Sequence, residues 1–401
     1  GLARVDWICE AIVERLEIKR ELLARVDAER APGTIVSSNT SGIPLKAIAE
    51  GLSDDFRRHW LGTHFFNPPR YLRLLEVIPT AETDPAVVTR ISTFCDHRLG
   101  KGVVVAKDTP SFIANHIGIY AVMQTLKALT AGTFTIEEID AITGPATGKA
   151  KSATFRTLDV VGLDVLAHVA RDMTQRLDDP AAREVFAVPP IVQQMLEKKL
   201  LGEKTGQGFY KREKGAGGAS EILTLDTTSF TYRAKQSAKL PSLDAAKSVE
   251  DVGERIRTLY LGKDRVGEFL RATLGPTLLY AAQVSPAIAH SIDDVDRVMR
   301  WGFGWELGPF ETWDAIGIQN VLQSPPDGYS VLAAVSSFAI IPLSNPNLPF
   351  DLLRDLVPVT RIADVPLPGL PHLASGISWR LDGTEVLATP NLKEGVVSVI
   401  D

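Results

Sequence analysis

The first hundred residues alternate between two patterns of apolar residues, and this alternation leaves few folds open to the chain. Short apolar runs predict buried strands, and apolar residues at helical spacing predict amphipathic helices between them. The predicted strands cover residues 5–12, 34–37, 60–66, 74–78 and 103–106, and the predicted helices cover 16–30, 45–52 and 85–99. Strands that alternate with helices indicate an α/β fold with a mostly parallel sheet.

The strand-like pattern ends near Pro110, and helix-like segments follow it. The predicted helices cover residues 111–131, 136–143, 160–177 and 192–200. A stretch rich in Gly and Lys, residues 202–220, predicts a loop that ends this part. The sequence therefore predicts an α/β domain followed by an all-α domain.

One pattern of residues occurs twice in the chain. IEEID (136–140) is followed by Asp159, nineteen residues after the last Asp of the pattern, and IDDVD (292–296) is followed by Asp314, eighteen residues after its last Asp. A repeated pattern with nearly equal spacing predicts two copies of one helical unit.

The composition is that of a folded globular protein and argues against several classes of function. Of the 401 residues, 45% are hydrophobic and 23% are charged. The net charge of −6 argues against nucleic-acid binding, and no apolar run has the roughly 18–20 residues of a membrane helix. Cys9 and Cys95 form no CxxC pattern and the histidines lack metal-ligand spacing, so we expect no disulfide framework and no metal site. With no secretory signal visible, we expect a cytoplasmic protein.

A polar stretch, SSNTSG (37–42), directly follows a predicted strand. Its side chains, among them Asn39 and Ser41, would lie at the carboxyl end of that strand, where open α/β sheets bind ligands. The alternative is an ordinary strand-to-helix turn, since Ser, Asn and Thr also cap helices.

His64 opens the stretch HFFNPP (64–69), and Glu76 follows it by twelve residues. A carboxylate beside an imidazole fixes the tautomer of the ring and favours its protonated form, as a general base requires. The alternative is a core histidine bonded to a backbone carbonyl, together with an unrelated surface glutamate. Glu76 lies in an apolar stretch, LLEVI, where a carboxylate needs a partner, and this favours the pair.

A third stretch, KDTPSFIANHIG (107–118), predicts a helix capped by Asp108 or Thr109 with Pro110 at its first position. Asn115 then lies about one and a half turns into the helix and can point at the site. The alternative is an asparagine that faces solvent or is satisfied in the core.

Taken together, these stretches resemble the 3-hydroxyacyl-CoA dehydrogenase family of fatty-acid β-oxidation, in its long, multifunctional form. The resemblance runs in order over residues 5–212 through EAIVERLEIK (10–19), SNTS (38–41), HFFNP (64–68), LLEVI (74–78), KDTPSFIAN (107–115), FRTLDVVGLD (155–164) and KTGQGFY (204–210). It implies a partial Rossmann-type parallel sheet domain followed by the family's helical carboxyl domains.

The resemblance also implies a reaction, in which an L-3-hydroxyacyl-CoA becomes a 3-ketoacyl-CoA and C3 passes a hydride to NAD. By resemblance, His64 takes the hydroxyl proton and Glu76 orients His64. Ser41 and Asn115 bond the reacting oxygen or position substrate and cofactor. The positions expected near NAD are Glu14, Lys19, Asn39, Ser41 and Asn67.

The resemblance divides the chain into five parts. These are a partial NAD-binding domain (1–108), a helical carboxyl domain for substrate binding or dimerisation (109–213), a linker (214–260), a second helical copy (261–320) and an unrelated-looking tail (321–401). The strand and glycine loop that hold the NAD pyrophosphate are missing, so we expect an amino-terminally truncated dehydrogenase. The tail, over 325–367, resembles a fragment of a periplasmic tricarboxylate-binding receptor.

The implied partners are an acyl-CoA substrate, a second copy of the chain paired through the helical domain, and an enoyl-CoA hydratase module. Three alternatives stay open from the sequence. In the first, the chain is an inactive remnant that binds acyl-CoA or dimerises. In the second, it is a dehydrogenase of a small hydroxy acid. In the third, which rests on the tail alone, it is a solute-binding protein.

Overall fold

The computed structural model describes residues 1–177, 180–214, 220–322, 387–391 and 396–400. Residues 1–327 form one compact unit and residues 328–401 form a second. Within the second unit the structure describes one antiparallel pair, β9 (Leu387–Asn391) with β10 (Val396–Ile400). The predicted receptor-like segment, 325–367, lies outside the described residues.

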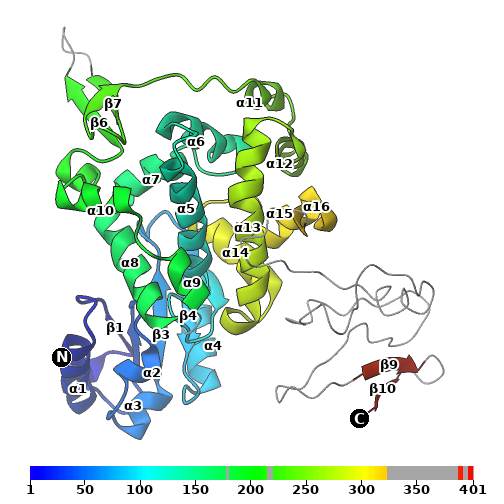
Figure 1. Ribbon diagram of the computed structural model, residues 1–401. Coiled ribbons are helices and arrows are strands. Elements are labelled where there is room, and N and C mark those ends of the chain that lie inside the picture. The colour runs from blue at the N-terminus through cyan, green and yellow to red at the C-terminus, as the bar shows by residue number, and fades with distance from the viewer. Residues whose placement is uncertain (178–179, 215–219, 323–386, 392–395, 401) are drawn as a thin grey trace. The chain divides into compact units, whose positions relative to one another are not determined.

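A five-stranded sheet forms the amino-terminal part (Figure 1). Its strands, in spatial and sequence order, are β1 (Trp7–Glu10), β2 (Ile35–Ser38), β3 (Trp60–Phe65), β4 (Leu74–Pro79) and β5 (Gly102–Val105). β1, β2 and β3 are parallel to one another and β4 is parallel to β5, while β3 and β4 are antiparallel. The α/β fold with a mostly parallel sheet is therefore confirmed.

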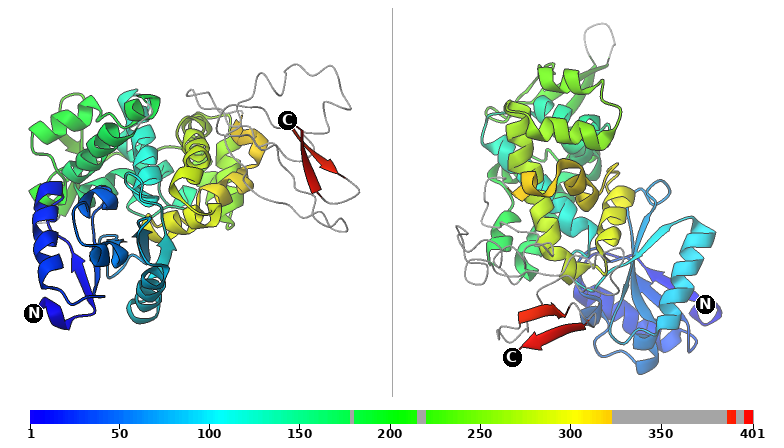
Figure 2. Two further views of the ribbon diagram at one scale, coloured as in Figure 1. Left: turned by 90° about the horizontal axis from the view of Figure 1, so that it is seen from below. Right: turned by 90° about the vertical axis from the view of Figure 1, so that its right-hand side faces the viewer.

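Helices cover both faces of the sheet, because successive strand residues point to opposite sides. They are α1 (Leu16–Glu29), α2 (Leu45–Ile48), α3 (Asp54–Arg58) and α4 (Pro85–Leu99). α4 packs Ile91 and Cys95 against Leu75 and Val77 of β4. Leu74 and Ile78 of that strand face the opposite side, where they belong to one core cluster with Ile117 and Val298 of the helical part. Figure 2 shows the helical part beside the sheet and its helices. Glu76 lies between Leu74 and Ile78 in this alternation, so it shares their face.

The helical part begins with a long helix that packs against the sheet. Its helices are α5 (Ala114–Thr130), α6 (Ile136–Ile142), α7 (Ala153–Val161), α8 (Leu163–Arg176), α9 (Pro180–Val185) and α10 (Pro190–Glu197). α6 begins with a capping box, in which Thr135 and Glu138 each accept a hydrogen bond from the backbone amide of the other. The predicted helices of this region are present, but the predicted start of the first is wrong: α5 begins at Ala114 and not at Pro110, so Asn115 lies in its first turn.

The prediction of a loop over 202–220 is wrong, because strands occupy part of this stretch, and the region predicted as a linker, 214–260, also contains strands and helices. A three-stranded antiparallel sheet and two helices occupy it, namely β6 (Tyr210–Lys214), β7 (Ser220–Leu225), β8 (Tyr232–Ala234), α11 (Pro241–Ala246) and α12 (Val252–Leu261). The strand YKREK carries almost no apolar residue. Its position depends instead on Asp159, whose carboxylate accepts from the amides of Phe209 and Tyr210, both at 2.8 Å.

The second helical copy consists of α13 (Arg265–Ile288), α14 (Ile292–Gly302), α15 (Pro309–Ile316) and α16 (Ile318–Leu322). The repeated sequence has the same local structure in both copies. Asp140 accepts from the amide of Phe155 at 2.8 Å, and Asp296 accepts from the amide of Phe310 at 2.8 Å. The long helices α5 and α13 run side by side (Figure 1).

Candidate active site

His64 and Glu76 meet because β3 and β4 are antiparallel. The two residues are directly paired in the register of these strands, and side chains at paired positions lie on the same face of a sheet. The Nδ1 of His64 is 2.7 Å from Oε2 of Glu76, with the residues 3% and 0% exposed. The predicted pair is present, and neither side chain takes the alternative role considered from the sequence.

The second oxygen of Glu76 is bound by the start of α5. Oε1 accepts from the backbone amides of Ile113 and Ala114, at 3.0 and 2.9 Å. These are amides that the helix itself leaves unpaired, and the helix dipole favours a negative charge at this end. Both oxygens of the buried carboxylate therefore have hydrogen-bond partners.

The state of the imidazole follows from this contact. A carboxylate only accepts, so the Nδ1 of His64 carries the hydrogen and Nε2 carries the lone pair. Within the described part of the chain, Nε2 has no hydrogen-bond partner. His64 thus presents an open proton acceptor.

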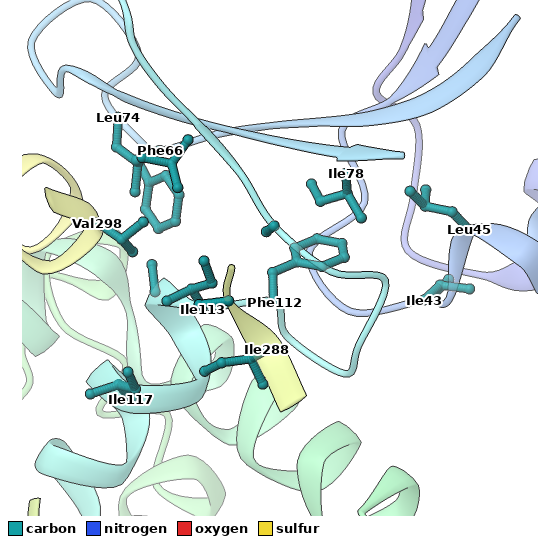
Figure 3. Packing of buried hydrophobic residues seen from close by; sticks show 14 of the residues in the cluster. Ile43, Leu45, Phe66, Leu74, Ile78, Phe112, Ile113, Ile117, Ile288 and Val298 are labelled. Carbon is teal, nitrogen blue, oxygen red and sulfur yellow. The ribbon is translucent and has the colours of Figure 1, made fainter. Parts of the chain in front are cut away.

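Two aromatic rings enclose the imidazole. The ring centroids of Phe66 and Phe112 lie 4.5 and 5.5 Å from that of His64. Figure 3 shows Phe66 beside Leu74 and Val298, and Phe112 beneath the strands. These apolar walls limit the access of water and strengthen the electrostatic interactions of the pair.

Ser41 and Asn115, the two residues predicted to bond the reacting oxygen, lie on different elements. Asn115 directly follows Ala114, and Ser41 lies on the loop after β2; both are half-buried. Neither side chain has a hydrogen-bond partner among the residues that the structure describes. Asn39 is used locally, since its Oδ1 accepts from the amide of Phe65 at 2.9 Å and ties the end of β2 to that of β3.

The predicted cofactor residues Glu14 and Lys19 belong to a buried ionic cluster. The Lys19 ammonium, 1% exposed, lies 2.9 Å from Glu10 Oε1 and 3.2 Å from Glu14 Oε2. Oε1 of Glu14 accepts from the Thr40 hydroxyl at 2.5 Å and from the Ser41 amide at 2.9 Å. Burial raises the pKa of Glu14, but the Thr40 hydrogen bond and the Lys19 charge outweigh it, and the pKa lies below its usual value. The cluster shapes the loop that carries Ser41.

Glu10 is a structural partner that the sequence reasoning missed. Besides Lys19, it binds the Ser38 hydroxyl at 2.5 Å. An acid at the end of an apolar strand needs a partner, and this signal could have identified it. Asn67 is exposed, and its role at the cofactor stays a prediction.

Within the described ranges, no three His, Cys, Asp or Glu side chains are arranged to hold a metal ion. In the same part of the chain, no helix has the length and apolar character needed to cross a membrane.

Comparison with known proteins assigns the chain to a family. Residues 1–109 match "3-hydroxyacyl-CoA dehydrogenase, NAD binding domain", and residues 112–212 match "3-hydroxyacyl-CoA dehydrogenase, C-terminal domain". A Mycobacterium tuberculosis protein named 3-hydroxybutyryl-CoA dehydrogenase is 33% identical over 204 residues, 51% of this chain and 69% of that protein. The chain belongs to the 3-hydroxyacyl-CoA dehydrogenase family. The resemblance to this family found over residues 5–212 is confirmed.

Two other relatives of this dehydrogenase family are much longer than the chain. A Bacillus subtilis protein named "Probable 3-hydroxyacyl-CoA dehydrogenase" is 50% identical over 319 residues, 80% of this chain and 40% of that protein. A Rickettsia felis protein named as a fatty acid oxidation complex trifunctional enzyme is 31% identical over 308 residues, 76% of this chain and 41% of that protein. The chain spans less than half the length of these two relatives.

A solved structure shares the fold. Escherichia coli 3-hydroxybutyryl-CoA dehydrogenase aligns with a TM-score of 0.58 at 24% identity, covering 80% of this chain and 76% of that one.

The family's cofactor, NAD, fits the polar groups at the ends of β1 and β2. A nicotinamide carboxamide accepts through its oxygen and donates through its amino group. Glu14, with 26% of its side chain exposed, offers acceptor oxygens, and the unpartnered Ser41 hydroxyl offers both functions. Lys19 is enclosed and would act through Glu14.

Proposed function

We propose that the chain oxidises L-3-hydroxyacyl-CoA to 3-ketoacyl-CoA with hydride transfer to NAD, as in fatty-acid β-oxidation. The observation that carries this proposal is the buried His64–Glu76 pair, which leaves Nε2 of His64 open as a proton acceptor. The chain that holds this pair belongs to the 3-hydroxyacyl-CoA dehydrogenase family. The pair favours this reaction over the alternative of a remnant that only binds acyl-CoA.

His64 acts as the general base in this proposal. Its Nε2 takes the proton of the C3 hydroxyl, and the Glu76 carboxylate stabilises the imidazolium that forms. The amides of Ile113 and Ala114 hold the Glu76 carboxylate in place. NAD, when bound, would supply the hydride acceptor.

Ser41 and Asn115 have half-buried side chains without a hydrogen-bond partner among the described residues, and Asn115 directly follows Ala114, whose amide binds Glu76. We assign to them the hydrogen bonds that hold the reacting oxygen. Glu14, Asn39, Ser41 and Asn67 would hold the cofactor, with Lys19 acting through Glu14. Phe66 and Phe112 exclude water from the base.

The test is the absorbance of NADH during its oxidation with acetoacetyl-CoA. His64→Ala should lower kcat by about 10²–10⁴-fold, the usual contribution of a general base. His97→Ala is the control, because the His97 side chain is 71% exposed, and it should retain the wild-type rate. Turnover that survives His64→Ala would contradict the proposal. A folded wild-type chain without turnover would favour the remnant that binds acyl-CoA or dimerises.

The proposed partners include a second copy of the chain. Val160, Val161 and Val165 are 53%, 48% and 43% exposed on α7 and α8. In the second helical copy, Ile316 corresponds to Val161 and is fully buried. The neighbouring Ala315 packs on Gly253 of α12, the helix that contacts α15. We infer that a second chain covers the open face of the first copy, and Val161→Asp should then give a monomer in sedimentation.

An enoyl-CoA hydratase module is a further proposed partner. The trifunctional name of the Rickettsia relative supports it, since that protein extends well beyond the aligned residues. Co-purification of a separately expressed hydratase domain with this chain would test the association.

A further inference from the structure

The connection between β5 and α5 contains two consecutive residues in a left-handed conformation. Ser111 and Phe112 have φ angles of 61° and 53°, and neither is a glycine. Such residues cost on the order of 1–3 kcal/mol each and persist only where surrounding contacts hold them. Both are fully buried, and the next amides are those of Ile113 and Ala114, which bind Glu76.

The beginning of this connection is held by two other elements. Lys107 donates from its amide to Ile288 O at 3.1 Å and from its ammonium to Pro286 O at 2.6 Å, both on α13. Asp108 accepts from the amides of Leu45 and Lys46, at 3.0 and 3.1 Å. Within the turn that follows, from Pro110 to Phe112, the amide of Phe112 donates to Thr109 O at 3.1 Å, and a second contact holds the carbonyl of Pro110.

His116 fixes this turn from the first turn of α5. Its Nδ1 is 3.0 Å from the carbonyl oxygen of Pro110. Because a carbonyl only accepts, Nδ1 carries the hydrogen. Burial lowers the pKa of His116 to about 4, with the Pro110 contact acting in the opposite direction, so the ring stays neutral near pH 7.

The ring of His116 is itself held by aromatic side chains. It stacks on Tyr280 of α13 at 5.7 Å and meets Phe186 edge-on at 6.3 Å, between centroids. Through Tyr280, the second helical copy therefore contacts His116, the residue whose hydrogen bond holds the strained turn.

We propose that His116 is a positioning residue for the His64–Glu76 pair. Its Nδ1–H holds Pro110, which keeps Ser111 and Phe112 in place and the two amides directed at Glu76. The catalytic consequence rests on the proposed dehydrogenase function. A displacement of about 1 Å at a reacting group can cost 10²-fold in rate, so a turn that relaxes should lower kcat without a matching change in KM.

Two substitutions separate the hydrogen bond from the bulk of the side chain. His116→Asn places an amide N–H at the position of Nδ1, whereas His116→Gln places it nearer Nε2. We expect His116→Gln to lower kcat about 10-fold, the factor that one ordinary hydrogen bond contributes, with KM for acetoacetyl-CoA changed less than about twofold. His116→Asn should restore most of the rate.

His59→Gln is the matched control. The Nδ1 of His59 makes the same kind of contact, 2.7 Å from Asp55 O, at the opposite end of β3. This variant should leave kcat unchanged. Equal turnover in wild type and His116→Gln, or an equal loss in His116→Asn and His116→Gln, would overturn the proposal.

Amide exchange measured by NMR provides a readout that does not need turnover. The amides of Ile113 and Ala114 should exchange about 10-fold faster in His116→Gln than in wild type, and His116→Asn should restore their protection. Unchanged exchange in His116→Gln would overturn the positioning role. Faster exchange in a protein whose wild type lacks turnover would support the positioning role while contradicting the proposed function.

Discussion

Lys19 shows how one buried cation can determine the form of a site. Its ammonium is the counter-charge for both Glu10 and Glu14, and Glu14 in turn binds the loop that carries Ser41. A buried ion pair contributes little net stability compared with an apolar replacement, but the loss of one partner leaves a charge uncompensated. The cluster should therefore be sensitive to single substitutions.

We predict that Lys19→Met lowers the free energy of unfolding by about 3–5 kcal/mol, because it leaves two carboxylates without their cation. Arg90→Met is the control, since Arg90 and its partner Asp6 have 61% and 92% of their side chains exposed, and it should cost at most about 1 kcal/mol. Urea denaturation measures both. Equal costs for the two variants would show that the cluster is not the counter-charge system described.

At this scale the sequence identified the residues whose chemistry is visible in a short motif. The His64–Glu76 pair was predictable because a carboxylate in an apolar strand requires a polar partner, and a histidine on the neighbouring strand can provide it. His116 was not, because its role depends on the φ angles of Ser111 and Phe112 and on a carbonyl that no motif marks.

At the scale of elements, α14 packs directly on the strands that carry the site. The ring of Trp301 lies over Gly102 at the start of β5, and a Cβ at Gly302 would lie 2.6 Å from Leu74 of β4. Arg73 stacks over the same indole ring, 4.5 Å from its centroid. The second helical copy therefore forms part of the support for β4, and with it for Glu76.

We predict that Gly102→Ala costs about 1–3 kcal/mol by overpacking against Trp301. In a Trp301→Ala background the space is open, so the same substitution should cost less than about 0.5 kcal/mol. Urea unfolding of the four proteins of this cycle gives the coupling energy. If Gly102→Ala costs the same unfolding free energy in both backgrounds, the overpacking does not arise from Trp301.

The elements themselves were predictable only where periodicity is strong. The helices and strands of the first hundred residues follow their apolar patterns closely. The strands β6, β7 and β8 were missed, because YKREK has no alternation and its place is fixed by Asp159, about fifty residues away in sequence. The antiparallel pairing of β3 with β4, which joins His64 to Glu76, likewise depends on chain topology and not on either strand alone.

At the scale of the whole molecule, the two helical copies use buried aspartates in the same way. Burial raises the pKa of Asp140 and Asp159 to about 6 and that of Asp296 to about 7, although each accepts backbone amides. In the unfolded chain an aspartate titrates near 3.9. The native protein thus holds these protons at pH values where the unfolded chain has released them.

The sign of the resulting pH dependence follows from linkage. Stability falls with rising pH wherever the native state binds more protons than the unfolded state. The contribution of the three aspartates is fully present below about pH 4 and is lost as the pH rises through 6 to 7. Glu137 acts in a separate window: burial raises its pKa, but Arg233 and the Gln236 amide lower it to about 2 overall, so its contribution is lost only in acid.

Asp296→Asn isolates one of these contributions, because the amide is neutral at every pH and still accepts from the Phe310 amide. In the wild type, the Glu311 amide donates to Oδ2 of Asp296 at 3.2 Å. The variant loses this acceptor, so it should be less stable than the wild type at pH 5. Between pH 5 and pH 8 the variant should gain about 1–3 kcal/mol of unfolding free energy relative to wild type, since each unit of pKa shift is worth about 1.4 kcal/mol.

Asp314→Asn is the control. Asp314 is exposed on α15, and the difference in unfolding free energy between this variant and wild type should stay constant over the same pH range. Denaturation curves at the two pH values decide, and a difference for Asp296→Asn that stays flat or moves the other way would contradict a proton held there in the native state.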